Sequence, residues 1–169
     1  MIDARPAVLP ASAPSGVIAA GVHLFPVRIY YEDTDAGGIV YHANYLRFAE
    51  RARTEMMRLL GAEHSAIRSE EGVIWAVRAV SVDYRQPARL DDHLVVETRV
   101  TAMGGASLRL VQTILRQGAS PAFPDAAAKP PELAHIELRL ACIDGAGRPA
   151  RLPVRVRDAL AALAATGGT

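Results

Sequence analysis

The sequence lacks the features of three common classes of protein. Cys142 is the only cysteine, so no internal disulfide can form and no Cys-x-x-Cys pair is available for zinc or redox chemistry. No stretch offers the roughly 18 consecutive apolar residues that cross a bilayer. Lys and Arg number 19 against 18 Asp and Glu, and they are not bunched, so the basic stripe of a nucleic-acid-binding protein is missing. We therefore expect a cytoplasmic protein with no membrane span and no nucleic-acid partner.

Charge is also scarce at the start of the chain. Between Arg5 and Arg28 there is no Lys, Arg, Asp or Glu, which superficially resembles an export signal. Prolines and serines interrupt the segment, and no run of leucines forms a hydrophobic centre. We interpret residues 1–22 as a flexible Ala/Pro-rich leader, 23–160 as a single domain and 161–169 as a flexible tail. A length of 169 residues fits one domain.

The first half of that domain changes its hydrophobic period once. Residues 25–31 are typical of a strand, and a polar, glycine-containing turn follows. From Ile39 to Leu60 the apolar residues then recur at intervals of three and four, which predicts one long amphipathic helix. Gly61 is a natural stop after its last turn. The stripe consists of Tyr45, Phe48, Ala49, Ala52, Met56, Leu59 and Leu60.

The second half of the domain has the period-two pattern of strands. Four strands are predicted at 74–84, 94–102, 108–114 and 134–142, with Gly104-Gly105 as a tight turn. In the first of them, one face is predicted to carry Ile74, Ala76, Val80, Val82 and Tyr84. A proline-rich segment, 118–131, cannot pair inside a sheet, because proline lacks an amide donor, and is read as a mobile loop. Residues 153–165 suggest a short terminal helix.

These elements predict an α+β domain, in which a five-stranded antiparallel sheet wraps around one long helix. Such a sheet is thin and has open edges, so we expect self-association across an edge strand. Whether the assembly is a dimer or a tetramer stays open.

The segment between the first strand and the helix reads YYEDTDAGGIVYHANY, from Tyr30 to Tyr45. It resembles the active-site segment of the hotdog-fold acyl-CoA thioesterases, in particular the Tol–Pal-associated branch of the 4-hydroxybenzoyl-CoA thioesterase-like family. The resemblance continues through 50–55 and 87–92, and covers about 28–117 and 132–158. It implies the hotdog fold and hydrolysis of an acyl-CoA or acyl-carrier-protein thioester. The leader and the proline-rich loop look like additions to the family pattern.

The resemblance assigns the catalytic carboxylate to Asp35, the second acid of the Asp-x-Asp pair. It also assigns carbonyl polarisation to the backbone amide of His42. The physical reading agrees, because thioester hydrolysis needs a group that attacks the carbonyl or activates water, and donors for the developing oxyanion. The first amides of a helix have no internal partners and can serve as such donors. Asp35 is either a nucleophile or a general base, and the His42 imidazole either supplies a proton or only lines the pocket.

Other residues of the motif are assigned to substrate binding. Gly37 and Gly38 let a ligand approach the backbone closely. Coenzyme A carries phosphates, for which Arg85, Arg89 and Arg99 are candidates, although ordinary solvated surface charges explain them equally well. The remaining substrate-binding candidates are Val40, Tyr41, Asn44 and Tyr45. Packing alone would explain the tyrosines, and Asn44 is expected to hold the backbone or Asp35 in place.

Structural roles for the same residues, and two other functions, remain as alternatives. Asp33 and Asp35 are both typical of turn and capping positions, and Asp33 is read as structural. Successive strand residues point to opposite faces, so Glu32 and Asp33 converge poorly on a metal, and neither metal nor cofactor is expected. The rival functions are a hotdog dehydratase or hydratase, and a non-catalytic partner of acyl carrier protein or of envelope-linked machinery.

Overall fold

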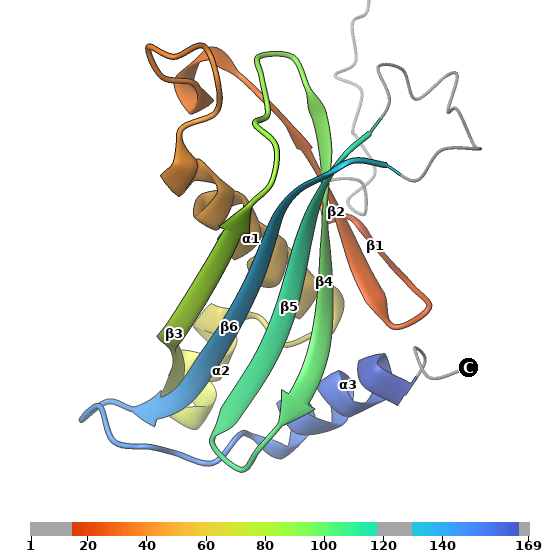
Figure 1. Cartoon of the computed structure of the whole chain (residues 1–169). Helices are drawn as coiled ribbons and strands as arrows, with labels where there is room; N and C mark the ends of the chain where they lie inside the picture. Colours follow the sequence, from red (N-terminus) through yellow and green to blue (C-terminus); the bar gives the residue numbers. More distant parts are fainter. Residues whose placement is uncertain (1–14, 118–129, 166–169) are drawn as a thin grey trace, which may run out of the picture.

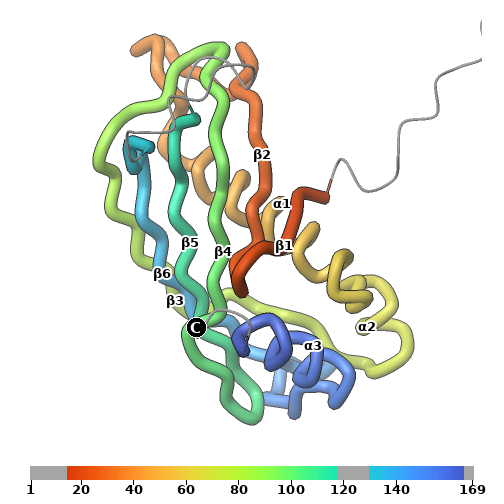
Figure 2. Tube along the Cα trace, turned by 90° about the vertical axis from the view of Figure 1, so that its right-hand side faces the viewer, coloured from red at the N-terminus to blue at the C-terminus, as the bar shows by residue number. Residues whose placement is uncertain are grey.

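The structure, a computed structural model that describes residues 15–117 and 130–165, is an antiparallel six-stranded sheet with three α-helices on or beside one of its faces (Figures 1 and 2). The strand order is β1-β2-β4-β5-β6-β3, which leaves β1 and β3 at the edges. The strands are β1 (Val17–Ala19), β2 (Val22–Arg28), β3 (Val73–Tyr84), β4 (His93–Met103), β5 (Ser107–Arg116) and β6 (Glu132–Asp144). The helices are α1 (His42–Leu59), α2 (His64–Glu71) and α3 (Val154–Ala165).

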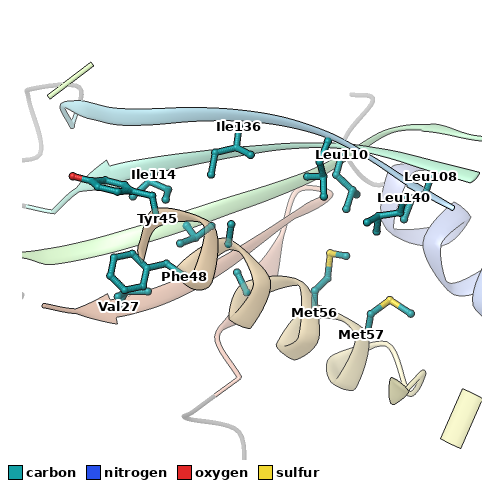
Figure 3. Packing of buried hydrophobic residues seen from close by; sticks show 14 of the residues in the cluster. Val27, Tyr45, Phe48, Met56, Met57, Leu108, Leu110, Ile114, Ile136 and Leu140 are labelled. Carbon is teal, nitrogen blue, oxygen red and sulfur yellow. The ribbon is translucent and has the colours of Figure 1, made fainter. Parts of the chain in front are cut away.

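Helix α1 packs its apolar stripe against the inner face of the sheet, as the three-and-four periodicity predicts. Phe48, Ala49, Ala52 and Met56 are buried on it. Alternating residues of β5 and β6 meet the helix, and Figure 3 shows several of them around Tyr45, Phe48 and Met56. The buried alternating residues of β5 and β6 are Leu108, Leu110, Ile114, Ile136, Leu138 and Leu140. The predicted α+β layering is confirmed.

A buried polar network fixes the middle of α1 to the sheet. Gln112 of β5 is fully buried, and its amide nitrogen donates to the Ala49 carbonyl at 3.0 Å and to the Thr98 hydroxyl at 2.9 Å. Its amide oxygen accepts from the Arg53 guanidinium at 2.6 Å, and Arg53 also pairs with Glu50. Burial lowers the pKa of Arg53 against the opposing effect of Glu50. A buried charge is tolerable only with such partners, so this network sets the position of the helix along the sheet.

The side chains of strand β3 do not all lie on the predicted face of the sheet. Its pairing with β6 shifts register between Val77 and Ala79, and this bulge moves the later residues to the other face. Ile74 and Ala76 therefore share the outer face, whereas Val80, Val82 and Tyr84 share the inner one. The prediction that all five lie on one face was wrong, because an inserted residue breaks a period of two.

Two strands begin inside the segment predicted to be a leader. Residues 17–19 form β1, and β2 starts at Val22 rather than at Phe25. The turn between them consists of Ala20 and Gly21, both with positive φ, which is the geometry that suits a two-residue hairpin. The sheet therefore has six strands where five were predicted. Residues 1–14 lie outside the described part of the chain.

The helix boundaries also differ from expectation. Helix α1 begins at His42, not at Ile39, because residues 34–40 form a loop closed by a bridge between Thr34 and Val40. Helix α2 was not predicted, and Ile67 is its only buried residue. Helix α3 forms over the range predicted for the terminal helix and ends at Ala165 as expected, so residues 161–165 of the range assigned to a flexible tail are helical. Residues 118–129 of the proline-rich segment and 166–169 of the tail lie outside the described residues.

Across the described ranges, no helix combines the length and the apolarity that crossing a membrane requires.

Candidate active site

The predicted catalytic segment is a short loop between β2 and α1, bounded by a 3₁₀ turn at Tyr31–Asp33. The amide of Asp35 donates to the Ile39 carbonyl at 3.0 Å, and the amide of Gly38 donates to the Asp35 carbonyl at 3.0 Å. Gly38 has a φ of +72°, a conformation that a residue with a Cβ adopts only with strain. The Val40 amide donates to the Ala88 carbonyl at 2.9 Å. The loop is thus hydrogen-bonded to Ala88 at its end and is tightly folded between Asp35 and Ile39.

Asp33 and Asp35 occupy opposite environments. The Asp33 side chain is buried, and its Oδ2 accepts a hydrogen bond from the Tyr30 amide at 2.9 Å. Asp35 is exposed, and its Oδ1 accepts from the Gly37 amide at 2.8 Å. A Cβ at Gly37 would lie 3.0 Å from that same oxygen, so glycine allows the close approach. The structural role expected for Asp33 agrees with its bond to the backbone, while Asp35 keeps one carboxylate oxygen without a partner among the described residues.

Helix α1 begins with unpaired donors. Its N-cap residue, Tyr41, makes no side-chain capping bond. Within residues 15–117 and 130–165, no hydrogen bond engages the amides of His42 and Ala43, whereas the Asn44 amide donates back to the Tyr41 carbonyl at 2.9 Å. Such amides carry the positive end of the helix dipole. They can therefore donate to an oxygen atom that acquires negative charge.

An open hollow of about 280 Å³ lies at this end of the helix. Its lining comes from the loop between β2 and α1, the first turns of α1, the end of β3 and the residues that follow β3. The lining residues are Ile39, Val40, His42, Tyr45, Tyr84, Arg85, Gln86 and Pro87. Asp35 is not among them; its amide donates to the carbonyl of Ile39, so only its backbone is tied to a residue of the lining. The surface is mainly apolar with a few polar groups, which suits an acyl or pantetheine chain.

Two tyrosines that line the hollow are hydrogen-bonded to backbone groups beside it. Tyr45 is buried, and its hydroxyl accepts a hydrogen bond from the Ala88 amide at 2.8 Å. The Tyr84 hydroxyl donates to the His42 carbonyl at 2.9 Å, and its ring meets Tyr45 edge-on at 5.5 Å. Burial raises the pKa of both phenols, so both stay protonated at neutral pH. Sequence reasoning placed Tyr84 only on a strand face, since its partner His42 lies 42 residues earlier in the chain.

Asn44 lies behind the catalytic loop rather than in the hollow. It is buried, and its amide nitrogen donates to the Asp33 carbonyl at 2.9 Å, while its amide oxygen accepts from Arg47 at 3.3 Å. The same side of the loop borders a second open hollow, lined by Glu32, Asp33, Asn44, Arg47, Glu50 and Arg51. Asn44 therefore supports the loop, as expected, and its place does not favour direct contact with a substrate in the first hollow.

Arg85, Arg89 and Arg116 differ in whether their guanidinium groups have partners among the described residues. Arg85 lines the hollow but is paired with Glu132 at 2.7 Å and with Asp83 at 3.0 Å. The Arg89 side chain is exposed without a partner among the described residues, and only its amide is held, by Asp92. Arg116, which sequence analysis did not single out, pairs with Asp92 at 3.0 Å and donates to the Pro87 carbonyl at 2.5 Å. It fixes the segment that follows β3.

The structure thus brings one part of the predicted site together. Val40, His42, Tyr45 and Arg85 share the hollow, and Asp35, Gly37 and Gly38 form the adjacent loop. Tyr41 is half exposed at the start of the helix. Arg99 lies on β4 beside Glu97, away from the residues that line the hollow. No group of three or more His, Cys, Asp or Glu residues suited to a metal ion occurs within the described ranges.

Comparison with known proteins places this chain in a family. Residues 30–162 match the thioesterase-like superfamily. The acyl-CoA thioesterase YbgC of Haemophilus influenzae is 40% identical over 136 residues, covering 80% of this chain and 91% of that protein. The acyl-CoA thioester hydrolase YbgC of Escherichia coli is 53% identical over 91 residues, covering 54% of this chain and 67% of that protein.

A solved structure supports the fold assignment independently. The probable thioesterase from Bartonella henselae superposes with a TM-score of 0.68 at 33% identity, covering 78% of this chain and 99% of that one. The family match spans the loop between β2 and α1, helix α1 and all four strands from β3 to β6, so it includes every residue that lines the hollow.

Proposed function

Because the chain belongs to the thioesterase-like superfamily, whose hotdog fold it shares, we propose that it hydrolyses acyl-CoA thioesters with Asp35 as the catalytic carboxylate. One observation carries the proposal. The exposed Asp35 carboxylate is held at one oxygen by the Gly37 amide, on a loop that leads directly into the unpaired first amides of α1. A negative group and an oxyanion-binding group therefore come from one short segment.

The proposed reaction begins with the thioester carbonyl oxygen facing the amides of His42 and Ala43. These donors stabilise the negative charge that develops on that oxygen as the carbonyl carbon becomes tetrahedral. The carbon is attacked either by the free carboxylate oxygen of Asp35 or by a water molecule from which Asp35 removes a proton. Collapse of the tetrahedral species breaks the carbon–sulfur bond and releases the coenzyme A thiolate. The direct route leaves an acyl-aspartyl anhydride, which water then hydrolyses.

The bond from Gly37 gives Asp35 a defined orientation. It occupies Oδ1 and leaves Oδ2 without a partner among the described residues. A positioned carboxylate oxygen loses less entropy on reaching the carbonyl than a free side chain would. The His42 ring borders the same hollow and contacts the rings of Tyr41 and Tyr84. We assign it to the pocket wall, from which it can also donate a proton to the leaving thiolate.

The hollow beside the loop is the proposed binding place for the part of the substrate next to the thioester. Val40, Tyr45 and Pro87 give it an apolar lining, which suits a methylene chain. Of the two arginines predicted for the phosphates, Arg89 is the better candidate, since Arg85 is already neutralised by two carboxylates. The proposed chemistry uses no metal or bound cofactor, because coenzyme A is part of the substrate.

We also propose that the enzyme is a homo-oligomer that pairs through β3. This strand is an edge of the sheet, and its inner-face side chains Val77, Val80 and Tyr84 are 54%, 45% and 45% exposed. Exposed apolar side chains on an open edge favour pairing with another strand. Tyr84 belongs to both this edge and the hollow, so a second copy would cover the hollow from the β3 side.

The thioester that the enzyme hydrolyses can be carried by coenzyme A or by acyl carrier protein. A carrier-protein thioester presents the same carbonyl and the same pantetheine arm as an acyl-CoA, so acyl carrier protein is a second proposed source of substrate. The Tol–Pal connection implied by the resemblance, like the cytoplasmic location, stays a prediction.

The test is a thiol-release assay with purified protein and acyl-CoAs of graded chain length, together with benzoyl-type CoAs. Hydrolysis of at least one series supports the proposal. An enoyl-CoA is included and is scored for hydration of its double bond, so that hydratase activity is detected separately. Hydration without thiol release, or binding of acyl carrier protein without turnover of any thioester, would instead support one of the rival functions.

A further inference from the structure

Two arginines face each other on the side of the sheet turned away from α1. Arg109 of β5 and Arg139 of β6 are directly opposite in the strand register. Their neighbours along the strands, Leu108 and Leu140, are buried on the inner face. Because successive side chains of a strand point to opposite faces, both guanidinium groups project from the outer face.

Neither arginine of this pair is matched by a paired carboxylate. Directly opposite residues of antiparallel strands have Cβ atoms about 4.5–5.5 Å apart, and like charges there repel. Neither guanidinium forms an ion pair or a hydrogen bond with any residue that the structure describes. The nearest acid along β6 on the same face is Glu137, whose carboxylate is 70% exposed and lies 3.7 Å from His135. The two positive charges therefore stand side by side without a carboxylate between them.

The arginines border an open hollow of about 450 Å³ in the outer face. Ser81 of β3 and Thr101 of β4 also line it and bring hydroxyl groups, while Glu137 stands in its wall. None of these residues lines the hollow at the start of α1. The outer hollow is thus a separate place on the molecule, with two guanidinium groups and two hydroxyl donors.

We propose that this hollow, which we call the outer-face site, binds a phosphate group. A guanidinium presents two parallel N–H donors that match two phosphate oxygens, so two facing arginines can hold one phosphate from both sides. The bound anion would also remove the repulsion that the cross-strand pair otherwise suffers. The phosphate can belong to a small molecule such as a nucleotide or to the headgroup of an anionic phospholipid. This inference does not depend on the proposed hydrolase activity.

The experiment uses the full chain and titrates it with inorganic phosphate and with adenosine 3′,5′-bisphosphate, by calorimetry at low ionic strength. Arg109→Gln and Arg139→Gln are each expected to weaken binding by about tenfold or more, because each removes a charge-assisted contact. The matched control is Arg68→Gln, which removes the same charge from α2. Anionic and neutral lipid vesicles are tested in parallel by co-sedimentation. Preference for the bisphosphate or for anionic vesicles identifies the source of the phosphate.

Thermal unfolding supplies a second measurement that does not depend on calorimetric signal. Without phosphate, Arg139→Gln should melt at a higher temperature than the wild type, since one of two repelling charges is gone. Adding phosphate should raise the melting temperature of the wild type and of Arg68→Gln more than that of Arg139→Gln. Equal phosphate shifts in all variants, or failure of the wild type to bind any of the phosphate ligands, would overturn the proposal.

Discussion

At the scale of the residue, the two aspartates of the loop between β2 and α1 occupy different environments. Asp33 is buried and its carboxylate bonds the Tyr30 amide, so it stabilises the turn. Asp35 is exposed and bonded only at one oxygen, by Gly37. The same residue type therefore stabilises a turn at one position and, two residues later, keeps one carboxylate oxygen without a partner among the described residues.

The first prediction concerns the phenol that holds the segment after β3. Tyr45→Phe removes the acceptor of the Ala88 amide and leaves that buried donor without its partner. We expect the free energy of unfolding to fall by about 1–3 kcal/mol and KM to rise, because Pro87 lines the hollow beside Ala88. Urea denaturation and steady-state assays measure the two effects.

The matched control for this change is Tyr41→Phe. Tyr41 is half exposed, and its hydroxyl makes no hydrogen bond to the described residues. Losing its hydroxyl should change stability by less than about 0.5 kcal/mol. Equal destabilisation in the two variants would show that the hydroxyl of Tyr45 does not support the hollow.

Sequence reasoning could reach the residues of one contiguous motif but not those that meet it from elsewhere. Asp35, Gly37 and His42 lie within eight positions, and their spacing alone indicates a turn before a helix. Tyr84 and Arg116 enter the site through the pairing of β3 with β6 and the ion pair with Asp92. Such contacts depend on register and on long-range packing, which a single sequence does not encode in any local pattern.

At the scale of the element, the predictions that rest on regular periodicity were confirmed, and those that cross an irregularity were not. The alternation of β6 is uninterrupted, and the predicted stripe of α1 packs against the sheet except at its end, where Leu59 is exposed. The bulge after Val77 reverses the faces of β3, and a bulge leaves the composition of a strand unchanged. Helix α2 was missed because a single buried residue, Ile67, gives no periodic signal.

The β1–β2 hairpin carries a pH-dependent contact. His23 is buried, and its Nε2 lies 2.8 Å from the Ser15 carbonyl, while the Ser15 hydroxyl donates to Glu55 of α1 at 2.6 Å. Burial lowers the pKa of His23, and the Ser15 carbonyl and Glu55 oppose this only in part. The unfolded state therefore binds more protons than the folded state below about pH 6.5, and stability falls as the pH drops through that range.

The second prediction follows from this loss of stability at low pH. We expect His23→Gln to make the free energy of unfolding less dependent on pH between 5 and 7, since glutamine does not titrate. Urea denaturation at both pH values measures the difference. His93→Gln, on the neighbouring strand β4, is the control. An unchanged pH dependence in His23→Gln would mean that His23 is not the group responsible.

At the scale of the whole molecule, both edge strands of the sheet expose apolar side chains, but the two strands differ in length. Strand β3 exposes Val77, Val80 and Tyr84 on its inner face, whereas the other edge is the three-residue strand β1, which exposes Val17 and Ile18. An open edge was predictable from the strand count. Which strand forms the edge was not, because the crossover that places β3 beside β6 has no signature in the sequence.

The third prediction tests pairing through β3. Val80→Asp places a charge in the exposed apolar edge, and we expect it to dissociate the oligomer and to reduce kcat/KM at least tenfold, because the hollow beside Tyr84 loses its cover. Analytical ultracentrifugation and thiol-release assays measure the two outcomes. Val154→Asp is the matched control, since Val154 is 73% exposed at the start of α3. An unchanged sedimentation coefficient in Val80→Asp would exclude this interface.

The most direct test of the account is the turnover of Asp35→Asn. Asparagine keeps an oxygen that can accept from the Gly37 amide, so the loop should fold as before and only the negative charge is lost. We predict that kcat for acyl-CoA hydrolysis falls at least about 100-fold, with an unchanged circular dichroism spectrum and unchanged affinity for the substrate. Glu32→Gln, which neutralises an exposed acid of the same segment, should keep wild-type turnover. Hydrolysis by Asp35→Asn at the wild-type rate would contradict the account.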